Sequence, residues 1–151
     1  MPTVHLMCGL PCSGKTTFAR KLAKSRSALY LGLDQLLISL YGQYLIGDIG
    51  HEEHIKRVLS ARVGIWKIAQ NAFSSNIDVI LDDGFFLKET RDRYTNMARE
   101  CHVNTNLYVI QTPINIVRER LQLRNKDLPS ENFFIEIETL DKMVDMFELP
   151  S

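Results

Sequence analysis

Short apolar runs alternate along this chain with longer segments whose apolar residues recur at helical spacing. Four of the short runs are rich in Val, Ile and Leu and are bounded by turn residues, which is typical of strands buried on both faces of a sheet. They cover residues 4–8, 28–33, 77–81 and 106–111. Strands separated by helices predict βαβ units, and therefore an α/β fold with a parallel sheet and helices on both of its faces.

The segments between these strands carry the helical pattern. We expect helices over residues 15–24, 52–74, 88–100, 114–125 and 137–147. Their apolar stripes include Ala19 and Leu22; Ile55, Leu59, Trp66, Ala69 and Phe73; Tyr94, Met97 and Ala98; Ile114, Val117 and Leu121; and Leu140, Val144 and Phe147. The chain has no internal repeat and no Pro/Gly/Ser-rich linker, so we expect one domain over residues 1–151.

The strongest motif follows the first strand. Residues 9–16 read GLPCSGKT and fit G-x-x-x-x-G-K-[ST], with a strand before them and a helix after them. Glycines let the backbone curl so that its N–H groups surround phosphate oxygens, and the helix directs its positive end at the same anion. We expect nucleotide contacts from Gly9, Pro11, Cys12, Ser13, Gly14, Lys15, Thr16 and Thr17.

Within this phosphate-binding loop, Lys15 is expected to reach the β- and γ-phosphates and the Thr16 hydroxyl to ligate Mg²⁺. The motif occurs in ATPases, GTPases and small-molecule kinases. The chain has no N-K-x-D motif for reading a guanine base and no D-x-x-G after the second strand. ATP is therefore the favoured nucleotide.

Asp34 follows the second strand, at the edge of the sheet where open α/β folds bind their ligands. A carboxylate beside the γ-phosphate can accept the proton of an acceptor hydroxyl. Asp is also a preferred helix N-cap, and a helix beginning near Gln35 would use it in that way. The residues alone leave both roles open.

Asp82 and Asp83 end the third apolar run. An apolar strand that ends in Asp beside a phosphate-binding loop is typical of a site that holds Mg²⁺ or its waters. The alternative is turn chemistry, because Asp-Gly is a common turn pair. We expect at least one of the two to serve the metal, and Asp82 better matches the usual strand-end position.

Arginines gather on the helix that follows Pro113. Arg120 and Arg124 are four residues apart and therefore share a helix face. Two guanidinium groups there suit a lid over bound ATP, one near the adenine and one on the transferring phosphoryl group. The alternative is an ordinary solvated basic face.

The composition narrows the choice of partners. The 151 residues include 18 basic and 18 acidic side chains, which disfavours a wholly basic nucleic-acid or membrane-surface binder. The positive charge is local: residues 1–34 carry five basic and one acidic side chain, and residues 112–126 carry four and one. An odd number of cysteines, no export signal and no long apolar segment favour a cytoplasmic protein without a membrane span.

Together these residues resemble the small P-loop kinases that include the 5′-kinase domain of phage polynucleotide kinase, zeta toxins and chloramphenicol phosphotransferase. The resemblance rests on residues 9–17, the Leu33-Asp34 strand end, residues 79–91, and residues 113–124 with the closing helix. It implies a three-layer P-loop fold with strand order 2-3-1-4. It also implies that Asp34 is the general base, that Arg124 is the lid arginine on the phosphates and that Arg120 lies nearer the nucleotide base.

The sequence departs from this pattern in one respect. Polynucleotide kinases place an Arg shortly after the Asp to hold an acceptor phosphate, whereas residues 35–38 here read QLLI. This departure disfavours a polynucleotide acceptor and suggests a less anionic one. Gln35, Tyr41 and Tyr44 are candidate acceptor-side residues.

We therefore expect an ATP:Mg²⁺-dependent phosphotransferase that acts on a hydroxyl group. The acceptor could be a nucleic-acid 5′ end, a nucleoside or nucleotide, a sugar nucleotide or another small molecule. The alternative from another functional class is a nucleotide-binding switch or regulatory ATPase without an acceptor, for which Asp34 would not be needed as a base.

Overall fold

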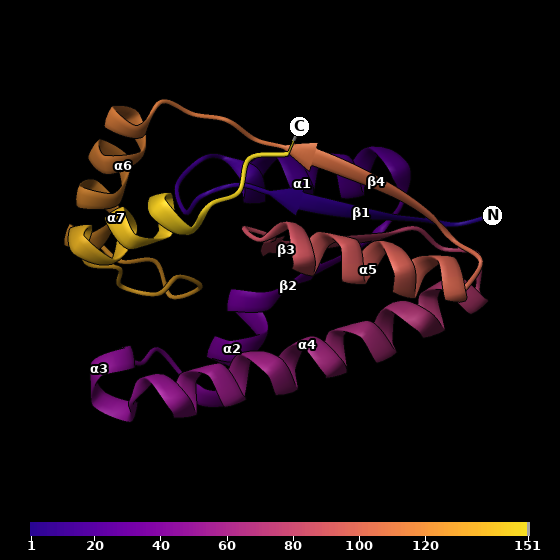
Figure 1. Cartoon of the computed structure of the whole chain (residues 1–151), viewed down its shortest axis with the longest axis horizontal. Helices are drawn as coiled ribbons and strands as arrows, with labels where there is room; N and C mark the ends of the chain where they lie inside the picture. Colours follow the sequence, from indigo (N-terminus) through magenta and orange to yellow (C-terminus); the bar gives the residue numbers. More distant parts are fainter. Residues whose placement is uncertain (151) are drawn as a thin grey trace.

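The computed structural model describes residues 1–150, so Ser151, the last residue of the expected domain, lies outside the described residues. Four parallel strands form one sheet in the order β2-β3-β1-β4 (Figure 1). They are β1 (Thr3–Cys8), β2 (Leu29–Gly32), β3 (Val79–Gly84) and β4 (Asn104–Val109). The expected α/β class, parallel sheet and strand order are confirmed.

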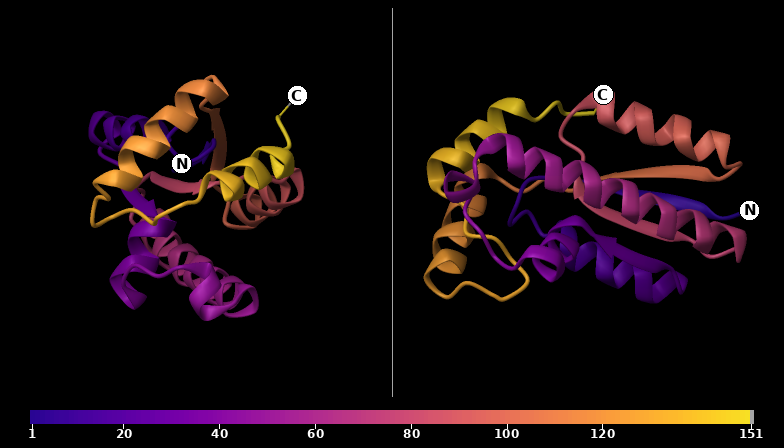
Figure 2. Two further views of the ribbon diagram at one scale, coloured as in Figure 1. Left: turned by 90° about the vertical axis from the view of Figure 1, so that its left-hand side faces the viewer. Right: turned by 90° about the horizontal axis from the view of Figure 1, so that it is seen from below.

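Helices cover both faces of the sheet and the end toward which its strands run. They are α1 (Lys15–Arg26), α2 (Leu33–Tyr41), α3 (Ile46–Ile49), α4 (His51–Ser74), α5 (Lys88–Glu100), α6 (Ile114–Lys126) and α7 (Ile137–Met146). Figure 2 shows α1 on one side of the sheet and α4 and α5 on the other, which gives three layers. Helices α6 and α7 lie beyond the carboxyl ends of the strands (Figure 1).

The alternation of side chains along β1 divides the core between the two faces of the sheet. Val4, Leu6 and Cys8 belong to the large core under α4 and α5, whereas Met7 packs with Ala19 of α1. A third, smaller core joins α6 to α7. Its buried members are Val117, Leu121 and Leu140, and Cys12 of the phosphate-binding loop packs against them. The two arginine-bearing turns of α6 are thereby fixed next to that loop.

Strand boundaries differ from the sequence expectation where side-chain contacts extend or shorten a strand. β3 runs on through Asp82 and Asp83 to Gly84, because other side chains hold both carboxylates inside the fold. β2 ends at Gly32, since Leu33 already belongs to α2. β4 lies two residues earlier than expected, and its exposed start belongs to the edge of the sheet.

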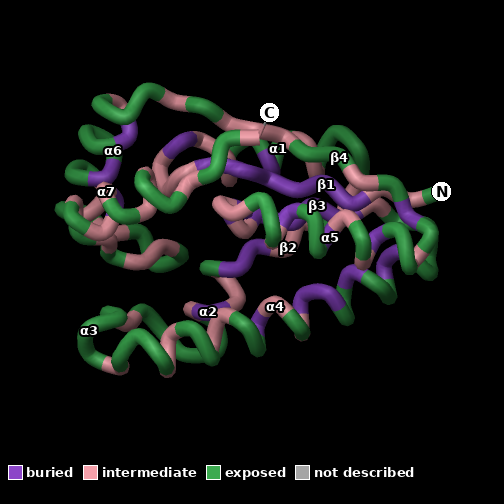
Figure 3. The backbone as a smooth tube through the Cα atoms, viewed as in Figure 1, coloured by how far each residue is buried: buried purple, intermediate pink, exposed green. Residues whose placement is uncertain are grey.

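Two of the expected apolar stripes are only partly buried. Trp66 and Phe73 of α4 are buried, but Ile55 and Leu59 in its first half are 41% and 49% exposed. Figure 3 shows this change from exposed to buried along α4. Helices α2 and α3 and the segment between them pack against α4, and His54 and Arg57 of its first half contact Tyr44 of that segment. Ile114 is likewise 39% exposed rather than part of the buried stripe of α6.

The loop between α6 and α7 contacts both α1 and the segment that follows α2. Glu131 in this loop pairs with Arg20 of α1 at 2.8 Å. The Gln43 side chain, just after α2, donates to the carbonyls of Pro129 and Asn132 at 3.0 and 2.7 Å. The described residues contain no helix that is long and apolar enough to cross a membrane.

Candidate functional site

The phosphate-binding loop connects β1 to α1 in a conformation that needs its glycines. Gly14 has φ of 96°, in the left-handed region that favours glycine, and Cys12 adopts φ of 60°. A Cβ atom on Gly9 would come within 2.9 Å of the Ser13 hydroxyl and 3.0 Å of the Ile110 carbonyl oxygen. Both fixed glycines of the motif are therefore required by the backbone path.

Carbonyl groups of the loop are held by residues outside it. Thr112 Oγ1 donates to the Ser13 carbonyl at 2.7 Å, and Arg120 Nη1 donates to the Cys12 carbonyl at 3.3 Å. Helix α1 begins at Lys15 with no side-chain cap, so the first-turn N–H groups of Lys15, Thr16 and Thr17 have no partner within the helix. These N–H groups are available to an anion.

Asp82 of β3 contacts side chains of both α1 and β2 at the carboxyl end of the sheet. Its backbone lies in the central strand β3, beside Met7 of β1 and Gly32 of β2. Oδ2 accepts hydrogen bonds from Thr16 at 2.6 Å and from Tyr30 at 2.5 Å. The ammonium group of Lys15 lies 3.8 Å from Oδ1. The predicted metal residues Thr16 and Asp82 are therefore in direct contact.

Asp83, the next residue, has a different partner. The Arg62 guanidinium of α4 donates to both of its carboxylate oxygens at 2.8 Å, and the Asp83 side chain is 7% exposed. This bidentate pair lies on the α4 side of the sheet and occupies the whole carboxylate. Of the two carboxylates predicted to serve the metal, Asp83 is thus paired with Arg62, and Asp82 is the one that keeps an oxygen without a hydrogen-bond partner.

Among residues 1–150, three buried side-chain polar atoms have no hydrogen-bond partner. They are Ser13 Oγ, Asp82 Oδ1 and Arg124 Nε. All three belong to residues that the sequence assigns to ATP or Mg²⁺. Buried polar atoms are nearly always paired in folded proteins, so such a concentration indicates a site that a ligand completes.

Asp34 lies in the first turn of α2, whose N-cap is Gly32. The N-cap alternative for Asp34 is therefore wrong. Asp34 is exposed to solvent as a residue, yet desolvation of its carboxyl group by nearby protein atoms raises its pKa. The charge of Lys15 lowers this pKa and that of Asp82 raises it. Arg124 and His54 also act on its charge, so Asp34 faces both the phosphate-binding loop and α4.

The three arginines of α6 have different surroundings. Arg120 reaches the phosphate-binding loop through the Cys12 carbonyl, and Arg124 is half-buried with its Nε unpaired. Arg118 instead forms an ion pair with Asp141 of α7 on the outside. The alternative of a uniformly solvated basic face therefore holds for Arg118 but not for Arg124.

The side chains of the three candidate acceptor-side residues make different contacts. The Gln35 side chain folds back onto Gly32, where a Cβ atom would lie 1.9 Å from its Oε1. Tyr44 Oη is 3.0 Å from His54 Nδ1, and its ring packs edge-on against Phe133. The rings of Tyr41 and Tyr44 both lie against the guanidinium of Arg57.

Sequence reasoning missed Tyr30, Arg62 and Thr112. Tyr30 stands two residues before the end of β2, Thr112 three residues after the end of β4, and Arg62 in the middle of a long helix. Only the strand-end location of Tyr30 and Thr112 could have drawn attention to them, because ligand sites of such sheets lie there. Nothing in the sequence pairs Arg62 with Asp83.

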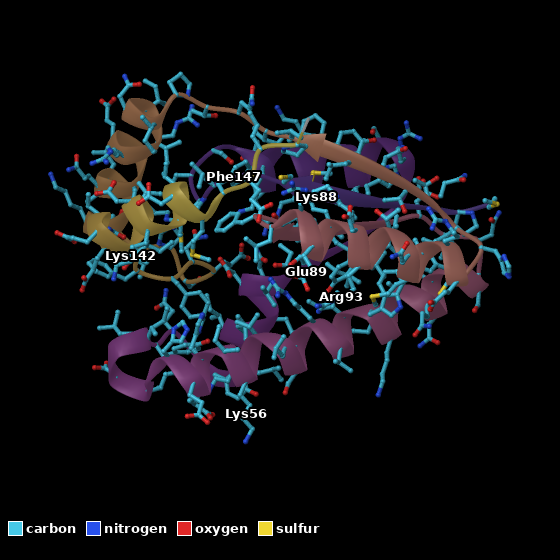
Figure 4. All side chains as sticks on the ribbon, viewed as in Figure 1. Lys56, Lys88, Glu89, Arg93, Lys142 and Phe147 are labelled. Carbon is cyan, nitrogen blue, oxygen red and sulfur yellow. The ribbon has the colours of Figure 1, made fainter. Side chains whose placement is uncertain are left out.

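Other features of the described residues offer no competing site. No group of three or more His, Cys, Asp and Glu side chains could hold a metal ion. A surface hollow of about 650 Å³ lies along α5, where Figure 4 labels Lys88, Glu89 and Arg93. Lys88 pairs with Asp92 and Arg93 with Glu89, so these charges stabilise the helix surface, and no predicted site residue lines the hollow.

Comparison with known proteins agrees with this geometry. A family model described as an AAA domain, AAA_33, matches residues 4–150. L-seryl-tRNA(Sec) kinase of Methanococcus maripaludis is 26% identical over an alignment of 150 positions, which covers 96% of this chain and 52% of that enzyme. The chain thus spans about half the length of the curated relative it matches.

Solved structures show the same fold. Kti12 of Chaetomium thermophilum, in complex with ADP-AlF3, has a TM-score of 0.73 at 22% identity and covers 98% of this chain and 81% of its own. A protein from Chloroflexus aurantiacus has a TM-score of 0.76 at 16% identity and covers 99% and 82%.

Proposed function

The chain belongs to the AAA_33 family of P-loop kinase-like domains, and on this basis we propose that it transfers the γ-phosphoryl group of ATP to a hydroxyl group of an acceptor. The family and the P-loop fold imply ATP binding. Beyond ATP binding, we propose the phosphoryl-transfer reaction and a role in it for each side chain near the phosphate-binding loop. One domain, residues 1–151, would carry all of these parts.

One observation carries the proposal. The three unpaired buried polar atoms belong to Ser13, Asp82 and Arg124, which come from the phosphate-binding loop, the central strand and the lid helix. These segments are far apart in the sequence and meet around one point. A nucleoside triphosphate with its metal ion offers phosphate oxygens to Ser13 Oγ and Arg124 Nε. It also offers a cation to Asp82 Oδ1, which otherwise has only the Lys15 ammonium group at 3.8 Å.

Each side chain near this point has a role in the proposed reaction. Lys15 and Arg124 stabilise the negative charge of the phosphoryl group during transfer. Asp34 accepts the proton of the acceptor hydroxyl while the hydroxyl oxygen attacks the γ-phosphorus, and the bond to the β-phosphate oxygen breaks to release ADP. Arg120 fixes the loop through the Cys12 carbonyl and faces the nucleotide.

Thr16 and Asp82 would hold Mg²⁺. The unpaired Oδ1 of Asp82 and the adjacent Thr16 hydroxyl are the hard oxygen donors that this ion prefers. When bound, the ion would neutralise charge on the β- and γ-phosphates. One carboxylate and one hydroxyl suit an ion that takes its remaining ligands from water and substrate phosphates.

The three cysteines are free, which agrees with the proposed cytoplasmic location. The proposed acceptor is a compound with a free hydroxyl group, and its identity is to be found by testing a panel of such compounds. The curated relative is a seryl-tRNA kinase, so seryl-tRNA joins RNA and DNA 5′-hydroxyls, nucleosides, sugar nucleotides and aminoglycosides as acceptors to test.

The test is transfer of labelled phosphate from ATP to this panel. We expect one class of acceptor to be labelled, and Asp34→Asn to reduce labelling by at least about 10²-fold while ATP affinity is unchanged. Lys15→Ala should abolish turnover. Asp48→Asn is the matched control, because Asp48 is an exposed carboxylate on α3.

The alternative of a regulatory ATPase predicts a different result. In that case ATP would be hydrolysed at a rate that no acceptor raises, and Asp34→Asn would leave the rate unchanged. This outcome would overturn the proposed kinase activity. Transfer that persists in Asp34→Asn would overturn only the assignment of the base.

A further inference from the structure

Arg57 of α4 is held in an unusually well-defined position on the acceptor side. Its guanidinium carbon lies 4.3 Å from the ring centre of Tyr41 and 4.8 Å from that of Tyr44. Its Nε donates to Glu53 one helical turn earlier, at 3.3 Å. The Arg57 side chain is 19% exposed. Two rings and one carboxylate therefore fix this guanidinium before any ligand arrives.

The two terminal nitrogens of Arg57 have no hydrogen-bond partner among residues 1–150. With the tyrosine rings stacked against it and Nε bound to Glu53, the guanidinium keeps its Nη1 and Nη2 donors for a ligand. Such a planar pair of N–H donors matches the oxygens of a phosphate. Tyr41 also remains 43% exposed, so part of its ring is open to a nucleobase.

This cation belongs to the same side of the site as Asp34. The Tyr44 hydroxyl lies near both Arg57 and Asp34. Burial raises the pKa of this hydroxyl, the charge of Arg57 lowers it and the charge of Asp34 raises it. His54 contacts Tyr44, and the charges of Asp34 and Arg57 also act on the pKa of His54. Helix α2 contacts α4, and Figure 1 shows it beside the first half of that helix.

The length of α2 sets the separation between the backbones of Asp34 and Tyr41, the residue against whose ring Arg57 lies. Asp34 is in its first turn and Tyr41 is its last residue, seven positions later. At 1.5 Å per residue this is about 10 Å along the helix axis. A ligand that reaches both ends of α2 must therefore extend about 10 Å from its reacting hydroxyl.

We propose that Arg57, held by Tyr41 and Tyr44, binds a phosphate group of the acceptor about 10 Å from the hydroxyl that Asp34 activates. The inference rests on the proposed kinase function and narrows its acceptor to an extended, phosphate-bearing molecule. A stacked aromatic beside a cation is the combination with which proteins bind single-stranded nucleic acid, which favours a nucleotide chain.

This proposal revises the expectation drawn from residues 35–38. No Arg follows Asp34 closely in the sequence, which by itself favours a less anionic acceptor. A residue that is distant in the sequence can still supply the cation. The fold supplies an Arg from α4, 23 residues after Asp34, to the same side of the site.

The experiment measures binding by equilibrium dialysis in the presence of ADP. One probe is a 5′-hydroxyl trinucleotide of RNA, and the second is the same trinucleotide with neutral methylphosphonate linkages. We expect the charged probe to bind at least about tenfold more tightly, and this preference to weaken as salt is raised. Arg57→Gln should abolish the preference, and Arg57→Lys should restore part of it.

Lys56→Gln is the matched control. Lys56 is the exposed neighbour of Arg57 and projects from the outer side of α4 (Figure 4), so its loss should leave the preference unchanged. Wild-type affinity for ADP in Arg57→Gln would show that this variant is folded.

The outcomes separate this proposal from the proposed function. Equal affinity for the two probes, no binding of either, or an unchanged preference in Arg57→Gln would overturn the phosphate site even if phosphoryl transfer is observed. A preference that depends on Arg57, together with no transfer to any acceptor of the panel, would count against the kinase activity alone.

Discussion

The hydroxyl of Tyr30 lies 2.5 Å from Oδ2 of Asp82, the oxygen to which Thr16 also donates at 2.6 Å. Tyr30 is on β2 and Asp82 on the neighbouring β3, so the contact crosses the carboxyl end of the sheet. A ligand that engages the Thr16 hydroxyl leaves Tyr30 as the remaining hydroxyl donor to this carboxylate. Tyr30 is therefore a positioning residue for Asp82.

Replacement of Tyr30 by Phe is expected to weaken the response to Mg²⁺. Loss of one hydrogen bond to a charged group removes about 1.5–3 kcal/mol, so the Mg²⁺ concentration needed for half-maximal transfer should rise about tenfold or more. The measurement is a Mg²⁺ titration of the transfer rate. Tyr108→Phe is the control, since Tyr108 bonds to His5 instead. An unchanged titration for Tyr30→Phe would remove its positioning role.

The pH dependence of transfer should report Asp34. Surrounding protein raises the pKa of its carboxyl group above the ordinary Asp value of 3.8. A general base must be deprotonated, so activity is present above this raised pKa and falls as the pH drops through it. The measurement is kcat/KM for the acceptor against pH, with ATP affinity followed in parallel. An acidic limb no higher than for an ordinary Asp would argue against this assignment.

Arg124 and Arg118 should differ sharply although both are on α6. Arg124→Gln removes a cation from the transferring group and should lower kcat at least about 10²-fold. Arg118→Gln breaks only an exposed ion pair with Asp141, so kcat should change less than about twofold. Steady-state kinetics of both variants test the lid assignment. Similar losses in the two variants would mean that α6 acts through general electrostatics.

Removal of Arg62 is expected to destabilise the fold. Arg62→Leu leaves the nearly buried carboxylate of Asp83 without its bidentate partner, which costs about 3 kcal/mol. Urea unfolding measures the loss, and the exposed pair of Arg93 with Glu89 supplies the control. Arg93→Leu should cost less than about 1 kcal/mol. A loss of the same size in both variants would contradict the structural role of the Arg62–Asp83 pair.

Cys12 should be a slow-reacting thiol whose modification blocks ATP. Burial raises the pKa of its thiol above 9.0, although Arg124 and Lys15 lower it. Alkylation by N-ethylmaleimide should therefore be slow at pH 7, faster at pH 9, and slowed further by bound ATP. ATP binding after alkylation is the measurement, with Cys12→Ser as the resistant variant. If Cys12→Ser were equally sensitive, the blocked thiol would not be Cys12.

Local chemistry made much of the site predictable from sequence. Residues 9–17 form their loop largely from their own glycines and the following helix, so spacing and flanking elements were sufficient. The place of Asp82 at the carboxyl end of the sheet was predictable because it follows the apolar residues of β3. Its companion Asp83 was not, because its role depends on Arg62, whose place opposite β3 is decided by how α4 packs on the sheet.

The acceptor side shows the same limit. Tyr41 and Tyr44 could be proposed from sequence because they follow Asp34 closely, but Arg57 depends on the packing of α4 against α2. The first half of α4 also showed why periodicity alone fails. Ile55 and Leu59 continue the apolar stripe, yet they are 41% and 49% exposed.

The central position of β3 divides the site into a fixed half and an adjustable half. The backbone of Asp82 is bonded into the sheet between β1 and β2, so it cannot shift without breaking strand pairing on both sides. Asp34, Arg57 and Arg124 are all carried by helices outside the sheet. In the proposed reaction, the residues assigned to the acceptor and to the transferring group can therefore move with their helices while Asp82 keeps its place in the sheet.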